Sequence, residues 1–159
     1  MKNLFFIFLC ITWVFFGCNK DYISSTSTFI KNESSVGVKI TLYLNGQTYD
    51  DEIKIINPGE RIEVFEDHPY GKTLQPSWPT LMLFYDSINV VFDNNPLVKI
   101  RHLVFSDTLN CNKCLPFSNN RNITNEQNYT KTIEKEHRKY LKGYFEFTIT
   151  EDDYNYAKD

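Results

Sequence analysis

The stretch VGVKITLYLNGQTYDDEIKII, residues 36–56, decides the fold class of this chain. In its first half, apolar side chains occupy every second position: Val36, Val38, Ile40, Leu42 and Leu44. This period of two predicts a strand with one buried face, because successive side chains of a strand point to opposite sides. Asn45-Gly46 then supplies the left-handed pair of a type I′ hairpin turn. Residues 47–56 are therefore expected to return as the antiparallel partner strand.

Similar signals continue along the chain. Asn57-Pro58-Gly59-Glu60 has proline and glycine at the two centres of a type II turn, and residues 61–65 follow as a strand that continues an antiparallel meander. Further strands are expected at 87–92, 97–105 and 145–149, and Thr150-Glu151-Asp152-Asp153 has the capping-box pattern of a short helix. For residues 130–142, two strands with a turn near 136–138 are preferred over a charged helix without an apolar stripe. These elements predict an all-β fold, a single antiparallel β-sandwich of immunoglobulin-like shape with a short C-terminal helix.

The length and composition indicate one folded domain. The chain has 159 residues with 17 Lys plus Arg and 20 Asp plus Glu. Removing residues 1–17, which contain only Lys2 among these, leaves 142 residues with 16 basic against 20 acidic side chains, a net charge of −4. This length supports one hydrophobic core, and the acidic balance argues against nucleic acid as a partner. The 13 Phe and 10 Tyr favour strands.

The first 18 residues have the order of an export signal that ends at a cysteine. Lys2 precedes an almost wholly apolar run from Leu4 to Gly17, which ends at Cys18. The run is too short to span a membrane, and a small residue directly before a cysteine resembles a bacterial lipobox, although Phe15 and Phe16 depart from its usual residues. The expected organisation is a signal peptide over 1–17, cleavage after Gly17, lipid on Cys18, a flexible tether over 18–28 and the domain over 29–159. The alternative is a plain secretory signal.

Four quoted motifs carry a resemblance to a known group. They are the lipobox, the early Phe-Ile-Lys-Asn-Glu-Ser strand, Asp-Ser-Ile-Asn-Val-Val-Phe-Asp, and the terminal Phe-Thr-Ile-Thr-Glu-Asp-Asp-Tyr. Together with the Pro-Gly-Glu turn, they make the chain similar to small lipoproteins of Bacteroidota. That group has no established activity. The resemblance therefore implies an outer-membrane location, periplasmic or surface-exposed, and a fold, but no catalytic residue.

Cys111-Asn-Lys-Cys114 is the sharpest local motif. In an oxidising compartment, two thiols three residues apart most simply form a disulfide that fixes one loop. Free thiols and a metal or redox site remain alternatives, and a zinc site would need His102 and His137 as further ligands. The sequence after Cys114 is poor helix, which argues against a thioredoxin-type redox site.

Aromatic side chains in a proline-rich loop are the candidate binding residues. Trp78, with Tyr70 and Tyr85, could stack on a sugar or anchor a protein partner. The alternative is that Trp78 folds back over one end of the sandwich. Asp86-Ser87-Ile88 and Asp107-Thr108-Leu109 fit a short O-glycosylation pattern, which makes Ser87 and Thr108 candidate sites.

No set of residues in the sequence combines a nucleophile, a base and an orienting group. His68, beside Asp67 in the proline-rich loop, is expected to be a solvated histidine. We therefore expect no catalytic site, no metal and no cofactor. The predicted function is non-enzymatic binding of a protein or glycan partner through loops, by a protein held at the membrane by its N-terminal lipid. The alternative is a structural or accessory outer-membrane lipoprotein with no ligand of its own.

Overall fold

A computed structural model describes residues 23–45, 47–69, 71, 73–76, 84–94, 96–107 and 111–159, and only the backbone of residues 49–53. Nine strands form two sheets in this part of the chain. The four-stranded sheet has the order β4 (Arg61–Asp67), β1 (Ile23–Asn32), β9 (Tyr140–Ile149) and β8 (Thr130–His137). The five-stranded sheet has the order β3 (Gln47–Ile56), β2 (Val38–Leu44), β5 (Ser87–Phe92), β6 (Val98–Leu103) and β7 (Cys114–Leu115).

The chain ends in the helix α3 (Glu151–Lys158), and a short 3-10 helix, η2 (Glu126–Asn128), precedes β8. The predicted capping box of α3 is confirmed, because the Asp153 carboxylate accepts hydrogen bonds from the N–H and the hydroxyl of Thr150, at 2.8 and 2.9 Å. The expected β-rich fold with a C-terminal helix is therefore confirmed. No helix among the described residues is both long and apolar enough to cross a bilayer.

Both predicted turns of the central hairpin region agree with the structure. Asn45 has a φ of 50° at the β2–β3 turn, and Gly59 has a φ of 78° between β3 and β4. The two strands predicted over residues 130–142 are also confirmed, since β8 and β9 form an antiparallel hairpin there. The expected meander is wrong after β3. The turn at 57–60 carries the chain into the other sheet, where β4 pairs with β1.

The sheets are mixed, which corrects the purely antiparallel arrangement expected from the sequence. β1 runs parallel to β9, with Ile30 beside Phe147, and β6 runs parallel to the short β7. The first and the last long strands of the described chain are thus neighbours with the same direction. No tight turn can join such a pair, so no local motif in the sequence announces it.

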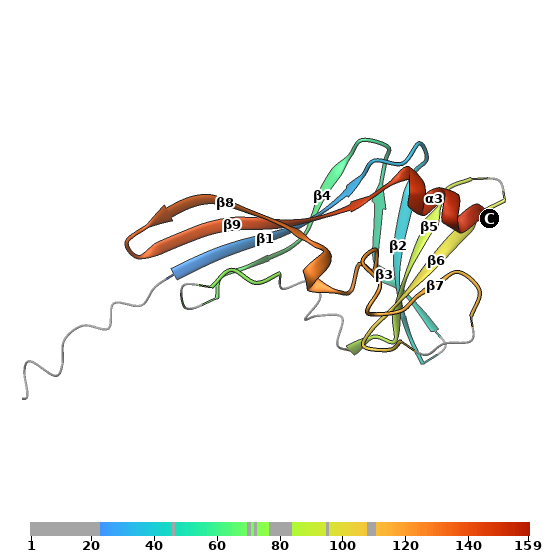
Figure 1. Cartoon of the computed structure of the whole chain (residues 1–159), viewed down its shortest axis with the longest axis horizontal. Coiled ribbons are helices and arrows are strands. Elements are labelled where there is room, and N and C mark those ends of the chain that lie inside the picture. Colours follow the sequence, from blue (N-terminus) through green and yellow to red (C-terminus); the bar gives the residue numbers. More distant parts are fainter. Residues whose placement is uncertain are drawn as a thin grey trace, which may run out of the picture.

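The four-stranded sheet extends well beyond the five-stranded one (Figure 1). We call this extension the arm and define it as residues 23–28 and 130–145. The chain enters the described structure at the free end of the arm, where the Ile23 N–H donates to the carbonyl of Lys139 at 3.1 Å. Residues 23–28, expected to be part of a flexible tether, are therefore strand residues. Their polar, β-branched composition reads as a linker, yet β1 satisfies its backbone by pairing with β4 and β9 on its two sides.

The hydrophobic core lies where the two sheets overlap. Its fully buried side chains come from both sheets and include Ile30, Ile40, Leu42, Ile56, Ile88, Phe92, Ile100 and Ile149. α3 packs beside this core, with the Tyr154 ring 5.4 Å from that of Phe92. On the arm, the buried side chain of Leu74 packs against the backbone of Gly143. A Cβ atom added to Gly143 would lie 2.5 Å from a methyl carbon of Leu74. The segment around residue 74 therefore covers one face of the arm.

Candidate functional site

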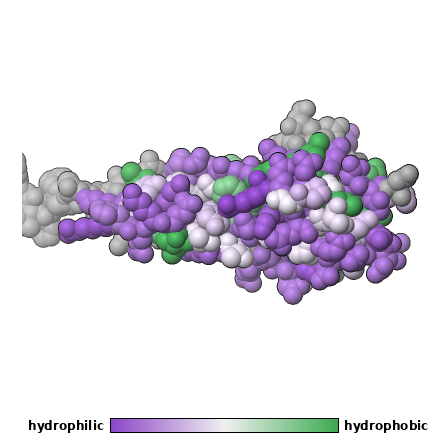
Figure 2. All heavy atoms as spheres, turned by 90° about the horizontal axis from the view of Figure 1, so that it is seen from above, coloured by the Kyte–Doolittle hydropathy of each residue, from purple (hydrophilic) through white to green (hydrophobic). Residues whose placement is uncertain are grey.

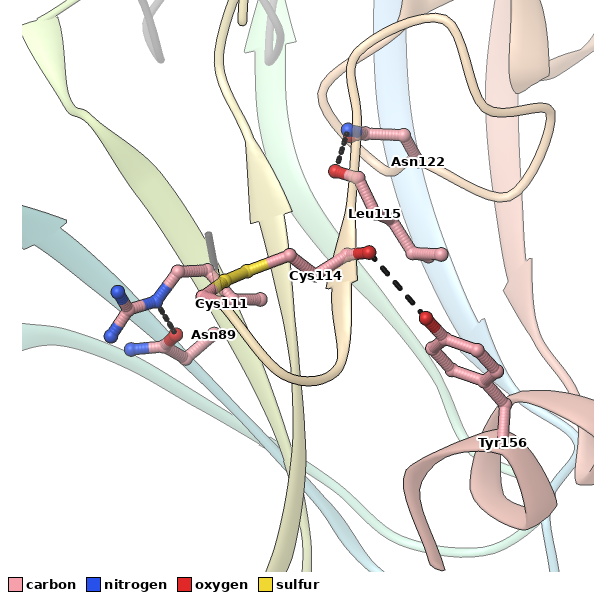
Figure 3. The surroundings of a disulfide bond; sticks show 7 residues. Asn89, Cys111, Cys114, Leu115, Asn122 and Tyr156 are labelled. Atoms are coloured by element: carbon pink, nitrogen blue, oxygen red, sulfur yellow. Dashed lines mark hydrogen bonds between the residues drawn. A yellow bond between two sulfur atoms is a disulfide. The ribbon is translucent and has the colours of Figure 1, made fainter. Parts of the chain in front are cut away.

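The Cys111–Cys114 loop lies at the open edge of the five-stranded sheet. The two Cα atoms are 5.8 Å apart with the sulfur atoms joined, as in a disulfide (Figure 3). The loop places Cys114 beside Arg101 of β6, whose N–H donates to the Lys113 carbonyl at 2.9 Å. The Tyr156 hydroxyl of α3 donates to the Cys114 carbonyl at 3.5 Å (Figure 3). This geometry fits the predicted disulfide, which fixes the loop that forms β7.

Asn122 organises the polar segment that follows this loop. It is fully buried, and its Nδ2 donates to the carbonyls of Leu103, Leu115 and Pro116 at 2.9–3.0 Å. Its Oδ1 accepts from the N–H and the hydroxyl of Thr124, both at 2.8 Å. The sequence shows only an Asn-rich polar stretch here, with no apolar periodicity. Asn122, which joins β6, β7 and the following loop, therefore could not be recognised from periodicity.

His102, a candidate zinc ligand in the sequence, has a structural role. It is 2% exposed on β6, and its Nδ1 accepts the Ile123 N–H at 3.1 Å. Burial lowers the pKa of His102 to about 3, while Asp153 raises it and Arg121 lowers it further. The ring is therefore neutral at pH 7. Among the described residues, no group of three His, Cys, Asp or Glu side chains could hold a metal ion.

Because His102 is buried, we expect the free energy of unfolding of the chain to depend on pH. The unfolded chain protonates this ring near its ordinary pKa of 6.5, and the folded chain does so only near 3. Between these pH values the unfolded state binds more protons than the folded state. The stability that depends on a neutral His102 is therefore fully present above pH 6.5 and is lost as the pH falls. We expect the free energy of unfolding to fall by about 1.4 kcal/mol per pH unit from this group alone.

Urea unfolding at pH 7 and pH 5 measures this dependence. His102→Leu, which keeps the site apolar, should lose about 2 kcal/mol less than the native chain between the two pH values. Equal losses in both proteins would show that His102 does not carry the effect. The comparison uses the difference between the pH values, so the cost of leaving the Ile123 N–H unpaired in the variant cancels.

A groove of about 350 Å³ lies on the outer face of the five-stranded sheet. Its lining comes from β2, β3, β5 and the β5–β6 turn and includes Lys39, Thr41, Ile55, Val91, Asp93 and Leu97. Ile55 and Leu97 are 66% and 67% exposed. The signal for this surface in the sequence is the adjacent apolar pair Ile55-Ile56, since only one of two neighbouring strand residues can face the core.

The other candidate residues are not brought together by the described structure. Tyr85 is half-buried against the core, whereas Trp78 and Tyr70 lie outside the described residues. Ser87 is 2% exposed in β5 between β2 and β6. The residues that follow it, Ile88, Asn89 and Val90, are buried as well. A glycan on Ser87 stays a prediction.

Thr108 lies outside the described residues, as do Gly17 and Cys18. His68 has a 64% exposed side chain, with its Nε2 3.9 Å from a Glu66 carboxylate oxygen, which agrees with a solvated loop histidine.

No family model, curated protein or solved structure matches this chain. The function therefore has to be inferred from the residues of the chain and from their geometry.

Proposed function

We propose that this chain is a lipoprotein of the bacterial cell envelope that binds a protein or glycan partner without catalysis. It is acylated at Cys18 and held in the outer membrane of a Bacteroidota-type cell. The order of residues 1–18 carries the proposal: one basic residue, an apolar run from Leu4 to Gly17, and then Cys18 directly before polar chain. In the same proposal, the two sheets form an immunoglobulin-like sandwich where they overlap.

The Cys111–Cys114 pair supports export. Disulfides persist in oxidising compartments such as the periplasm and the cell surface, and are rare in the reducing cytosol. A pair whose Cα atoms are 5.8 Å apart is within the normal range for a disulfide. The pair and the N-terminal segment therefore point to the same compartment from independent parts of the chain.

The groove beside β3 supports binding. Its lining includes two large apolar side chains that are exposed, Ile55 and Leu97. Lys39 and Asp93 add one charge of each sign to the lining. Exposed apolar side chains next to an edge strand are typical of surfaces that receive a partner. The exposed apolar side chains of this surface therefore support the proposed binding of a partner.

Cellular fractionation tests the anchor. The native protein should sediment with membranes and enter the detergent phase of a Triton X-114 separation, because several acyl chains together hold a protein stably. Cys18→Ala should remove this behaviour. The double variant Cys111→Ala/Cys114→Ala is the matched control and should stay in the membrane fraction. A native protein in the aqueous phase would instead indicate a plain secretory signal and overturn the proposed anchor.

A further inference from the structure

The free end of the arm carries a basic cluster. We define the arm tip as Ile23 with residues 134–142, which form the end of the β8–β9 hairpin. Its basic side chains are Lys135, Arg138, Lys139 and Lys142, against two acidic ones, Glu134 and Glu136. This gives the arm tip a net charge of +2, in a mature chain whose net charge is −4.

The side chains of the arm tip are available to a partner. Lys135, Arg138 and Lys139 are exposed, and Ile23 is 50% exposed beside them. Lys142 forms an ion pair with Glu134 at 3.0 Å. The other three basic side chains form no ion pair with any described residue, so they provide the free positive charge of the arm tip. Figure 2 shows that the surface of the arm is largely hydrophilic from above. The arm tip thus combines exposed cations with one exposed apolar side chain.

The length of chain before Ile23 fixes where the arm tip can lie. Cys18 precedes Ile23 by five residues. Five residues span at most about 18 Å when fully extended. Because Ile23 is hydrogen-bonded to the β8–β9 turn at Lys139, a lipid on Cys18 holds this turn within the same distance of the bilayer.

The opposite end of the molecule exposes acidic side chains. α3 lies at the far end from the arm tip (Figure 1). Its first turn carries the exposed Glu151 and Asp152, and Asp159 follows the last helical residue, Lys158. Asp153 is buried and paired with Arg121 at 2.7 Å, so it adds no free charge to this end. An anionic surface therefore attracts the arm tip and repels the α3 end, which favours one orientation of the molecule.

We propose that the arm tip docks on the anionic headgroups of the bilayer that holds Cys18, so that the arm stands on the membrane and presents the groove-bearing end away from it. This inference rests on the proposed lipid anchor. The recognised chemistry is a layer of phospholipid phosphates, which attracts nearby Lys and Arg side chains and whose field decays within about a Debye length.

Lysine footprinting of the whole mature chain on vesicles tests the inference. The Cys18 thiol is coupled to a maleimide lipid, which supplies the anchor whether or not the cell acylates this residue. An amine-reactive acetylating reagent is then applied on vesicles of phosphatidylcholine alone and on vesicles that also contain phosphatidylglycerol. Mass spectrometry gives the rate at each lysine, with Lys99 and Lys158 as exposed internal controls.

Lys135 and Lys139 should react about threefold more slowly, or slower still, on the anionic vesicles, because headgroup contact shields both amines. Lys99 and Lys158 should react equally on both kinds of vesicle. Arg138→Glu/Lys139→Glu should restore the rate at Lys135, whereas the matched reversal Lys39→Glu/Lys99→Glu should leave it slow. Equal rates at Lys135 on both vesicles would overturn the inference. Absence of acyl mass on the protein from cells would overturn the proposed anchor alone.

Discussion

Replacing Asn122 with alanine is expected to lower the free energy of unfolding by roughly 3–5 kcal/mol. The side chain is fully buried and satisfies carbonyls of Leu103, Leu115 and Pro116 as well as the Thr124 N–H. Alanine removes all of these hydrogen bonds, and each buried polar group that is left unpaired costs about 1–3 kcal/mol. Small domains have a total stability of about 5–15 kcal/mol, so this loss is a large share of the whole.

Urea unfolding followed by circular dichroism measures the effect. Asn120→Ala is the matched control, because Asn120 is exposed in the same loop and should change stability by less than about 0.5 kcal/mol. Thr124→Val keeps the shape but removes the hydroxyl that bonds to Asn122, and should fall between the two. A stability of Asn122→Ala equal to that of Asn120→Ala would contradict the role assigned to this network.

Gly143→Ala is expected to destabilise the chain by about 2–3 kcal/mol, as overpacking in a tight site does. A Cβ atom at this position would lie 2.5 Å from a Leu74 methyl carbon and 2.5 Å from the Thr132 carbonyl oxygen. The methyl group could move, but the carbonyl belongs to the neighbouring strand β8. The added carbon therefore has to separate β8 from β9 or displace the segment that covers the arm.

Gly37→Ala is the matched control for this substitution. A Cβ atom at Gly37 would meet only the Asp93 Cβ, at an ordinary contact distance of 3.7 Å. In thermal unfolding, the melting temperature of Gly143→Ala should therefore be well below that of Gly37→Ala. Equal melting temperatures would mean that the arm does not pack as described, and would also weaken the geometry on which the membrane-contact inference depends.

Strands with a regular alternation could be predicted from the sequence. Residues 36–56 contain their own register and their own turn, so both strands and the Asn45 turn were predicted close to their observed positions. The same holds for β5, β9 and the helix cap at Thr150. In these elements the deciding interactions lie within a few residues, which is the range that periodicity and turn motifs report.

Pairing between distant strands could not be predicted in this way. β1 reads as a polar tether because Ser24, Ser25, Thr26 and Thr28 have the composition of a linker, yet all four are buried. Their burial comes from β4, β9 and the segment near Pro69, which accepts hydrogen bonds from the N–H and hydroxyl of Ser24. Only the tertiary structure brings these partners together.

The buried asparagines were missed for a related reason. Asn32 and Asn122 each begin an Asn-x-Ser/Thr triplet, and in both the side-chain oxygen accepts from the N–H and the hydroxyl two residues on. Each amide nitrogen then donates to carbonyls of a separate segment, as Asn32 does to Ile56. The triplet is visible in the sequence and is compatible with such a local turn. Nothing local shows that the asparagine is buried or that its amide nitrogen reaches a separate segment.

In the candidate site, too, local features could be predicted from the sequence and features built from distant segments could not. The Cys111–Cys114 spacing is local and its geometry agrees with the predicted disulfide. The groove and the arm tip depend on residues from separate strands, and no single motif marks them. Trp78, the strongest aromatic candidate in the sequence, lies outside the described residues, so its binding role remains a prediction.

The intact mass of the protein extracted from its own membranes shows whether the chain is exported and held by lipid at Cys18. We expect loss of residues 1–17, added mass of acyl chains on Cys18, and a further gain of about two mass units when the Cys111–Cys114 disulfide is reduced. A chain that retains residues 1–17, or one cleaved without acyl mass, would contradict this expectation.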